Sequence, residues 1–181
     1  MRKYLNAELA NTLGNLLNRV ISPSINPSQV YPSRPSHSVP ECAAELVEQC
    51  RQLPSRVTAA YDVYEFYHGI IAIMDVLRAC NAYVQHEQPW LLAKSSTETD
   101  RQRLHTLIYV TLECLRVSGI LLQPIVPSIA TRLLDILAVD RRERSLFDCT
   151  SRTQSSAQTL NIIKNERVSL YQRLPMTDND L

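Results

Sequence analysis

The sequence predicts an all-α protein built as an up-and-down bundle of about five helices. Two facts of composition favour this fold class. The 181 residues include 3 glycines, where a typical frequency of about 7 % would give several times more, and aromatic residues make up 6 %. So few of either argue against β-sandwiches, barrels and glycine-rich phosphate-binding loops. The third observation is the spacing of the apolar residues, which recur at steps of three and four along most of the chain, as on one face of an α-helix.

The first predicted helix covers residues 3–21. Asn15 and Arg19 lie four residues apart on its polar face, so their side chains project side by side. This helix is rich in asparagine and contains Gly14, which lowers its helix propensity. The polar face either displays groups for a ligand or is simply solvated, and the spacing leaves both interpretations open. The apolar face, which would meet the core, consists of Leu5, Leu9, Leu13, Leu16 and Val20.

The middle of the chain predicts a connection and two helices. Five of the ten prolines lie in residues 22–40, which indicates an irregular, partly extended connection. A helix follows over 41–60, with a break expected at Pro54. Residues 61–88 carry the most regular pattern in the chain, and we expect one long core helix there. Its stripe consists of Val63, Phe66, Ile70, Ile73, Leu77, Cys80 and Val84.

The single tryptophan, Trp90, follows directly after this helix. Pro89 disfavours helical backbone at Gln88, so Trp90 is expected at or just beyond the helix end. It either covers the end of the bundle as a core or rim residue, or offers a flat aromatic face on which a nucleic-acid base can stack. The residues around it do not decide between these roles.

The last two predicted helices cover residues 100–123 and 128–139, separated by Pro124 and Pro127. The first of them is apolar nearly all round, which is typical of a helix buried between several neighbours. We therefore place the bundle in residues 1–148. Residues 149–181 are rich in serine, threonine and glutamine, and we expect a divergent, flexible tail. The predicted core contains Leu9, Leu16, Phe66, Ile70, Ile73, Leu77, Ile108, Leu115 and Leu122.

Motifs of catalysis and cofactor binding do not occur. There is no P-loop, no G-x-G-x-x-G and no H-E-x-x-H, and the four histidines have no metal-ligand spacing. The five cysteines are odd in number and include no C-x-x-C, so we expect core thiols rather than disulfides or a metal site. A net charge of +1 does not indicate a nucleic-acid partner. The sequence has no uninterrupted stretch of 18 apolar residues, so no membrane span is expected. The residues alone predict a helical binding or scaffold domain without catalytic residues, cofactor or metal.

Three segments resemble the anticodon-binding domain of methionyl-tRNA synthetases. NAELANTLGNLLNRV is similar to the family's first helix, N-a-x-L-a-x-x-l-G-N-L-x-x-R. RACNAYVQHEQPWLLAK is similar to x-x-N-x-y-i-x-x-x-x-P-W-x-l-a-k, and ECLRVSGILLQPIVPSIATRLLDIL to the long helix, P-x-x-P break and closing helix. INPSQVYP and ECLRV look most like the mitochondrial branch. The resemblance covers about residues 3–146, in the family's order and spacing.

The resemblance implies a function as well as a fold. It implies a bundle of the class I aminoacyl-tRNA synthetase anticodon-binding type, which recognises the CAU anticodon of methionine tRNA during charging for translation. Asn15 and Arg19 match the residues that hydrogen-bond anticodon bases, and Trp90 matches the residue that stacks on an unpaired base. The implied partner is methionine tRNA, with no DNA, no membrane and no obligate protein partner. The implied location is the mitochondrial matrix.

Two departures from the family pattern matter. The family's catalytic domain, with HIGH-like and KMSKS-like signatures and its ATP and magnesium, should precede residue 1, as should the targeting segment, and neither is in this sequence. The family's continuation does not match residues 149–181. The alternative function is therefore a structural or protein-interaction bundle, a degenerate fragment that does not bind RNA.

The purified chain is expected to be inactive as a methionine–tRNA ligase. It lacks any segment able to bind ATP and activate a carboxylate. Methionine-dependent ATP–pyrophosphate exchange measures this directly, and exchange above the enzyme-free background would contradict the prediction.

Overall fold

The computed structural model describes residues 11–35, 40–149 and 170. This part of the chain is helical and contains no β-strand, which confirms the all-α prediction. It has one α-helix more than the approximate number expected, because the segment around Trp90 forms a short helix of its own. The α-helices are α2 (Asn15–Val20), α3 (Glu41–Asp62), α4 (Phe66–Glu87), α5 (Pro89–Leu92), α6 (Glu98–Leu122) and α7 (Pro127–Ile136), followed by the 3-10 turns η2 (Arg141–Glu143) and η3 (Leu146–Cys149).

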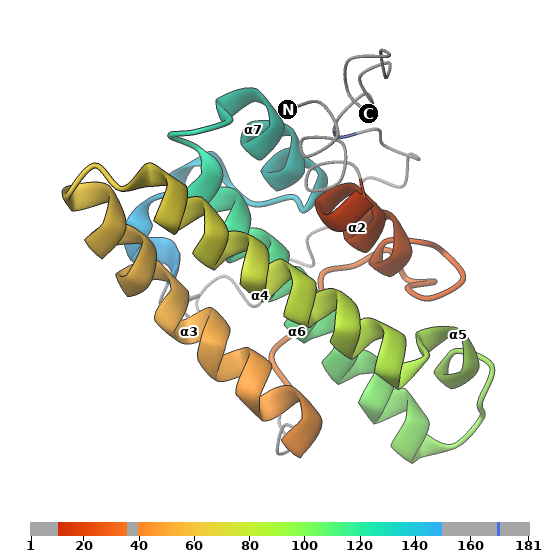
Figure 1. The fold of residues 1–181 in the computed structure, drawn as a ribbon. Helices are drawn as coiled ribbons and strands as arrows, with labels where there is room; N and C mark the ends of the chain where they lie inside the picture. The colour runs from red at the N-terminus through yellow and green to blue at the C-terminus, as the bar shows by residue number, and fades with distance from the viewer. Residues whose placement is uncertain (1–10, 36–39, 150–169, 171–181) are drawn as a thin grey trace, which may run out of the picture.

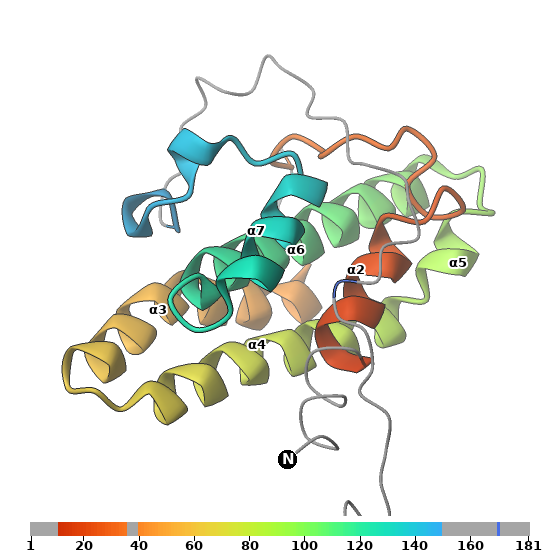
Figure 2. The ribbon, with the colours of Figure 1, turned by 90° about the horizontal axis from the view of Figure 1, so that it is seen from above.

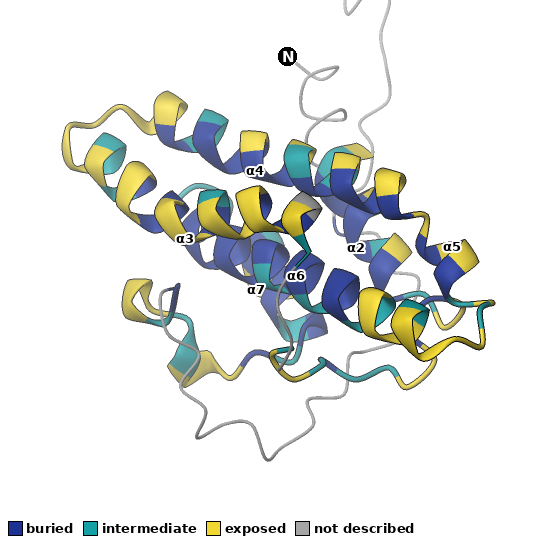
Figure 3. Ribbon diagram, turned by 90° about the horizontal axis from the view of Figure 1, so that it is seen from below, coloured by how far each residue is buried: buried dark blue, intermediate teal, exposed yellow. Residues whose placement is uncertain are grey.

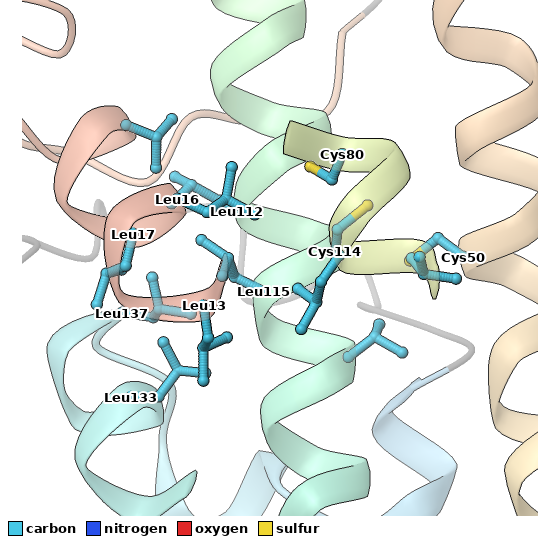
Figure 4. Close-up of a cluster of buried hydrophobic side chains, with 14 of the residues drawn as sticks. Leu13, Leu16, Leu17, Cys50, Cys80, Leu112, Cys114, Leu115, Leu133 and Leu137 are labelled. Atoms are coloured by element: carbon cyan, nitrogen blue, oxygen red, sulfur yellow. The ribbon is translucent and has the colours of Figure 1, made fainter. Parts of the chain in front are cut away.

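The bundle is organised around α6. Helices α3 and α4 run antiparallel as a pair, and α6 packs against both of them (Figures 1 and 2). On its other side α6 contacts α2 and α7 (Figure 4), and near its N-terminus it contacts α5 (Figure 1). Every residue of α6 from Thr106 to Leu122 is buried except Tyr109 and Glu113, as expected for a helix that is apolar nearly all round. By length and composition α6 could cross a membrane, but 78 % of its most apolar window is buried inside the bundle.

Helix α3 continues through Pro54, so the predicted break is wrong. A proline inside a helix removes one backbone hydrogen bond and normally kinks or ends the helix. Here the Pro54 side chain is buried, and α3 packs along α4 and α6 on both sides of it. Tertiary packing therefore outweighs the local preference.

The predicted long helix over 61–88 is divided by a turn. Helix α3 ends at Asp62, Tyr64 has a positive φ of 62°, and α4 begins at Phe66. As a result Val63 is exposed and Phe66 is 42 % exposed, so its predicted place in the core is wrong; its ring instead lies 5.4 Å from that of Tyr61. Ile70 is partly buried against the core. The predicted core residues confirmed as buried are Leu16, Ile73, Leu77, Ile108, Leu115 and Leu122.

Two predictions fall largely outside the described residues. Leu9 and the start of the first helix precede residue 11, and the tail prediction concerns residues 149–181, of which Cys149 and Leu170 are described and buried. The connection after α2 is irregular over residues 22–35, as expected. It is attached to α6 through the hydroxyl of Tyr31, which donates to Glu113 (2.6 Å).

Glycine and left-handed backbone are separated in this chain. Of the described residues, those with positive φ are Gln29, Tyr64, Gln88 and Ala138, and none of them is glycine. The glycines of α4 and α6 instead permit close packing. A Cβ added at Gly69 would collide with the ring of Tyr61, and one at Gly119 would lie 3.1 Å from methyl groups of Leu133 and Leu134.

The four cysteines whose side chains the structure describes are buried in the core, as expected of core thiols. Cys50, Cys80 and Cys114 project from α3, α4 and α6 toward one another (Figure 4), and Cys149 of η3 is also buried. Hydrogen bonding with Cys50 and Cys80, together with burial, raises the pKa of Cys114 well above its usual range. Burial raises the pKa of Cys149 to about 12. Among the described residues, no group of three or more His, Cys, Asp or Glu side chains has the arrangement of a metal site.

Cys114 is expected to resist alkylation while the protein is folded, because a buried thiol with a raised pKa stays protonated and the thiolate is the nucleophile. Iodoacetamide treatment near neutral pH followed by peptide mass spectrometry should label Cys114 far more slowly in the folded protein than in urea. Equal labelling rates in the two states would show that the thiol cluster opens readily.

Candidate nucleic-acid interface

The three residues singled out from the sequence lie on two short elements. Asn15 and Arg19 are exposed on α2, and Trp90 is 39 % exposed on α5. Figures 1, 2 and 3 all place α2 and α5 toward the same end of the α4–α6 pair. Among the interactions described, none joins Trp90 directly to Asn15 or Arg19. The structure therefore brings the two elements toward one end of the bundle, and no described interaction joins their candidate side chains.

The apolar side of α2 determines which way its polar side faces. Leu13, Leu16 and Leu17 are fully buried, and they lie against Leu112 and Leu115 of α6 (Figure 4). Leu133 of α7 and Leu137, directly after the end of α7, complete this cluster on the other side. With the leucines facing inward, the face of α2 that carries Asn15 and Arg19 is directed to solvent, as their spacing predicts.

A wide helical turn precedes Asn15, and side-chain amides hydrogen-bond to its carbonyls. Residues 11–14 form a π-helical turn, a feature that is frequent at functional sites. The Nδ2 of Asn81, on α4, donates to the carbonyl of Thr12 (3.2 Å) and to that of Leu77 (3.1 Å). Asn18 donates in the same way to the carbonyl of Gly14 (3.0 Å). Asn81 thus connects α4 to the first helix just before the exposed pair, a role that its place beside the apolar stripe did not reveal.

Trp90 is held out at a sharp elbow between α4 and α5. Gln88 adopts a left-handed conformation (φ 49°, ψ 60°), so helix α4 ends at Glu87, as Pro89 predicts. Pro89 is the first residue of α5, and it is buried together with Leu92. The side chain of Trp90 is therefore at the rim of the bundle, covered for the larger part and open for the rest. A rim position is compatible with both roles considered for this residue.

Directly beside this elbow lies an ion pair between a buried glutamate and a half-exposed arginine, which the sequence did not indicate. The side chain of Glu87 is 3 % exposed, and its Oε2 lies 3.0 Å from Nη2 of Arg103 on α6. Its Oε1 lies 3.2 Å from Nδ1 of the neighbouring His86. The sequence signal is weak because a lone glutamate near a helix end is normally solvated.

The start of α6 on the same side is capped. The hydroxyl of Thr97 accepts a hydrogen bond from the backbone N–H of Asp100 (3.3 Å). The carboxylate of Asp100 in turn accepts from the hydroxyls of Ser95 (2.6 Å) and Thr97 (2.8 Å), and these bonds lower the pKa of Asp100. The short segment between α4 and α6 is thus fixed at both of its ends.

Comparison with known proteins identifies the class. Residues 43–172 match the family model of the anticodon-binding domain of tRNA ligases. The chain belongs to this family. The match begins in the first turn of α3 and includes α4 to α7 and Trp90. It reaches beyond residue 148, where the sequence suggested that the bundle ends.

The individual relatives are methionine–tRNA ligases. The chain is 41 % identical over 157 residues to the mitochondrial enzyme of Homo sapiens, in a match that covers 80 % of this chain and 26 % of the relative. It is 40 % identical over 151 residues to the mitochondrial enzyme of Takifugu rubripes, covering 79 % and 25 %. The chain therefore spans about a quarter of the length of these relatives.

Solved structures agree in fold. The apo form of Mycobacterium tuberculosis methionyl-tRNA synthetase superposes with a TM-score of 0.86 at 29 % identity, over 97 % of this chain and 34 % of that one. The same enzyme bound by methionyl-adenylate gives a TM-score of 0.79 at 31 % identity, over 89 % and 31 %. These comparisons confirm the resemblance to methionyl-tRNA synthetases and the bundle type that it implies.

Replacement of Asn81 by alanine is expected to destabilise the protein by about 1 kcal/mol, because it removes a partly buried hydrogen bond between helices. Urea denaturation followed by circular dichroism measures the change, with Gln85→Ala, an exposed position of the same helix, as the matched control. Equal loss in the two variants would mean that the bond to Thr12 contributes nothing.

Proposed function

We propose that this chain recognises the CAU anticodon of methionine tRNA with the end of the bundle that carries Asn15, Arg19 and Trp90. The observation that carries the proposal is the combination of family and placement: in a member of the anticodon-binding family, an exposed Asn/Arg pair and a rim tryptophan lie on two elements at one end. Through this contact the chain would serve methionine charging, as part of the activity of a methionine–tRNA ligase. The mitochondrial relatives support a location in the mitochondrial matrix.

The chemistry of these side chains suits an unpaired loop. Bases in single-stranded loops can be splayed out, stacked on an aromatic ring and hydrogen-bonded along their edges. The amide of Asn15 offers a donor and an acceptor, and the guanidinium of Arg19 is a fixed fork of donors. An indole at the rim, with part of its surface open, offers a stacking surface and remains anchored by its buried neighbours Pro89 and Leu92.

The alternative function is a protein-interaction bundle that does not bind RNA. The observation that favours it is the apolar turn between α3 and α4, where Tyr64 is 82 % exposed beside the exposed Val63 and Tyr67. This turn lies at the other end of the α3–α4 pair from α5 (Figure 1). Binding of an anticodon stem-loop that weakens with salt and depends on CAU supports the first function. Binding that ignores the anticodon, or no binding, supports the alternative.

Trp90→Ala is expected to weaken binding of a CAU stem-loop about 5- to 150-fold, which corresponds to the ~1–3 kcal/mol that stacking contributes per base. The loss should be small for a stem-loop with another anticodon. Fluorescence anisotropy of labelled RNA measures both affinities, and Leu91→Ala, an exposed neighbour on the same helix, is the control. A lower melting temperature with an unchanged preference for CAU would assign Trp90 a purely structural role.

Asn15→Ala and Arg19→Ala are expected to relax discrimination between anticodons as well as weaken binding, because they remove edge contacts that depend on base identity. The ratio of affinities for CAU and single-base variants measures discrimination. Arg56→Ala, which removes an exposed arginine of α3, controls for the loss of one positive charge. If Arg19→Ala weakens all stem-loops by the same factor as the control, its role is electrostatic only. If Asn15→Ala leaves the ratio of affinities unchanged, Asn15 does not discriminate between anticodons.

A further inference from the structure

The carboxylate of Glu87 occupies a position that is costly for a charged group. It is almost completely buried, and a buried carboxylate is unfavourable unless it is paired and hydrogen-bonded. It also belongs to the last residue of α4, where the helix dipole disfavours negative charge. The groups around this carboxylate therefore determine whether its charged form is stable there.

The positive charge beside the carboxylate of Glu87 comes from Arg103 on α6. Nη2 of Arg103 lies 3.0 Å from Glu87 Oε2, and Nη1 of the same guanidinium lies 3.8 Å from Oδ1 of Asp100. Asp100 lies in the first turn of α6, where its N–H donates to the capping residue Thr97 and its carboxylate accepts from Ser95 and Thr97. One arginine therefore links the last residue of α4 to the first turn of α6.

These two points are the ends of the segment that carries Trp90. Residues 88–97 connect Glu87, the last residue of α4, to the capped start of α6, so the Glu87–Arg103 pair lies at the base of this connection. Gln88, the residue next to Glu87, has a left-handed backbone conformation. This conformation is unfavourable for residues other than glycine and persists only where the surrounding structure holds it.

We propose that Glu87 and Arg103 are positioning residues for Trp90, and that their ion pair fixes the place and exposure of the indole at the rim of the bundle. The effect of this ion pair on RNA binding rests on the proposed function, in which the indole must hold a fixed position for a base to stack on it. The effect of the ion pair on the position and exposure of the indole does not depend on RNA binding.

The chain offers a direct readout because Trp90 is its single tryptophan. Intrinsic fluorescence therefore reports this residue without a label. Glu87→Gln and Arg103→Gln should shift the emission maximum to longer wavelength and increase quenching by acrylamide, under conditions where circular dichroism shows the native helix content. Arg103→Lys, which keeps the charge, should restore part of the native signal. The matched control is Arg101→Gln, which removes an exposed pair with Glu98 (3.6 Å) in the same turn of α6.

Binding of the CAU stem-loop completes the test. Glu87→Gln should weaken binding several-fold in the native background and have no further effect in the Trp90→Ala background, because a positioning residue acts through the group that it positions. Arg103 is half exposed, so its variant keeps the test open if Glu87→Gln does not fold.

The outcomes separate the two proposals. If Glu87→Gln and Arg103→Gln leave the emission and quenching of Trp90 unchanged, or if Glu87→Gln weakens binding equally with and without Trp90, the positioning role is wrong. If Trp90→Ala binds the CAU stem-loop as tightly as the native chain, the proposed function is wrong, and the fluorescence of the variants still decides the positioning role.

Discussion

The burial of α6 on all sides is the constraint on which the rest of the structure depends. Because apolar residues cover nearly the whole circumference of this helix, it is stable only when neighbours surround it. Helices α2, α3, α4, α5 and α7 all contact it, and so does η3. The connection after α2 is also attached to it, since Tyr31 bonds to Glu113, and Glu113 in turn pairs with the buried Arg116 (2.8 Å). The guanidinium of Arg116 then donates to the carbonyl of Asp148 (2.7 Å), which ties the 3-10 turn η3 to the same helix.

The candidate interface illustrates how short elements acquire precision from such a scaffold. Helices α2 and α5 have six and four residues, too few to be stable alone in water. Each is fixed by apolar side chains that enter the core, Leu16 and Leu17 for α2, and Pro89 and Leu92 for α5. Each is fixed again by a polar contact to a longer helix, through Asn81 for α2 and through Glu87 and Arg103 for the elbow before α5. The residues that face solvent thus lie on short elements that both apolar and polar contacts attach to the longer helices.

Local and periodic features of this fold could be predicted from the sequence, and features that depend on packing could not. The stripe around Ile73 and Leu77 and the end of α4 before Pro89 follow from spacing and from the chemistry of proline. The three- and four-residue spacing of apolar residues continues through the turn between α3 and α4. Val63 and Phe66 therefore fit the helical pattern in the sequence, but the turn leaves them exposed. At Pro54 the error is the opposite one: the sequence predicts a break, but the helix continues because α3 packs against α4 and α6.

The candidate site divides in the same way. The exposed sides of Asn15 and Arg19 follow from helical geometry, and the position of Trp90 follows from Pro89. Asn81 and Glu87 could not be found by this route, because their partners, the carbonyl of Thr12 and the guanidinium of Arg103, lie on other helices and meet them only after folding. The roles of Asn15, Arg19 and Trp90 toward RNA stay predictions, since they come from the resemblance and not from periodicity.

The separation of glycine from left-handed backbone matters for anyone who wishes to make this domain more robust. General rules advise replacing helical glycines by alanine and leaving turns alone. Here a methyl group at Gly69 would collide with the ring of Tyr61, so that advice fails there, and one at Gly119 would make tight contacts with the leucines of α7. The opportunities lie in the turns instead, at Tyr64 and Ala138, where glycine or asparagine fits the positive φ that the present side chains tolerate at a cost. Tolerance to substitution in this molecule therefore follows backbone angle and crowding, and a choice by residue type alone selects the wrong sites.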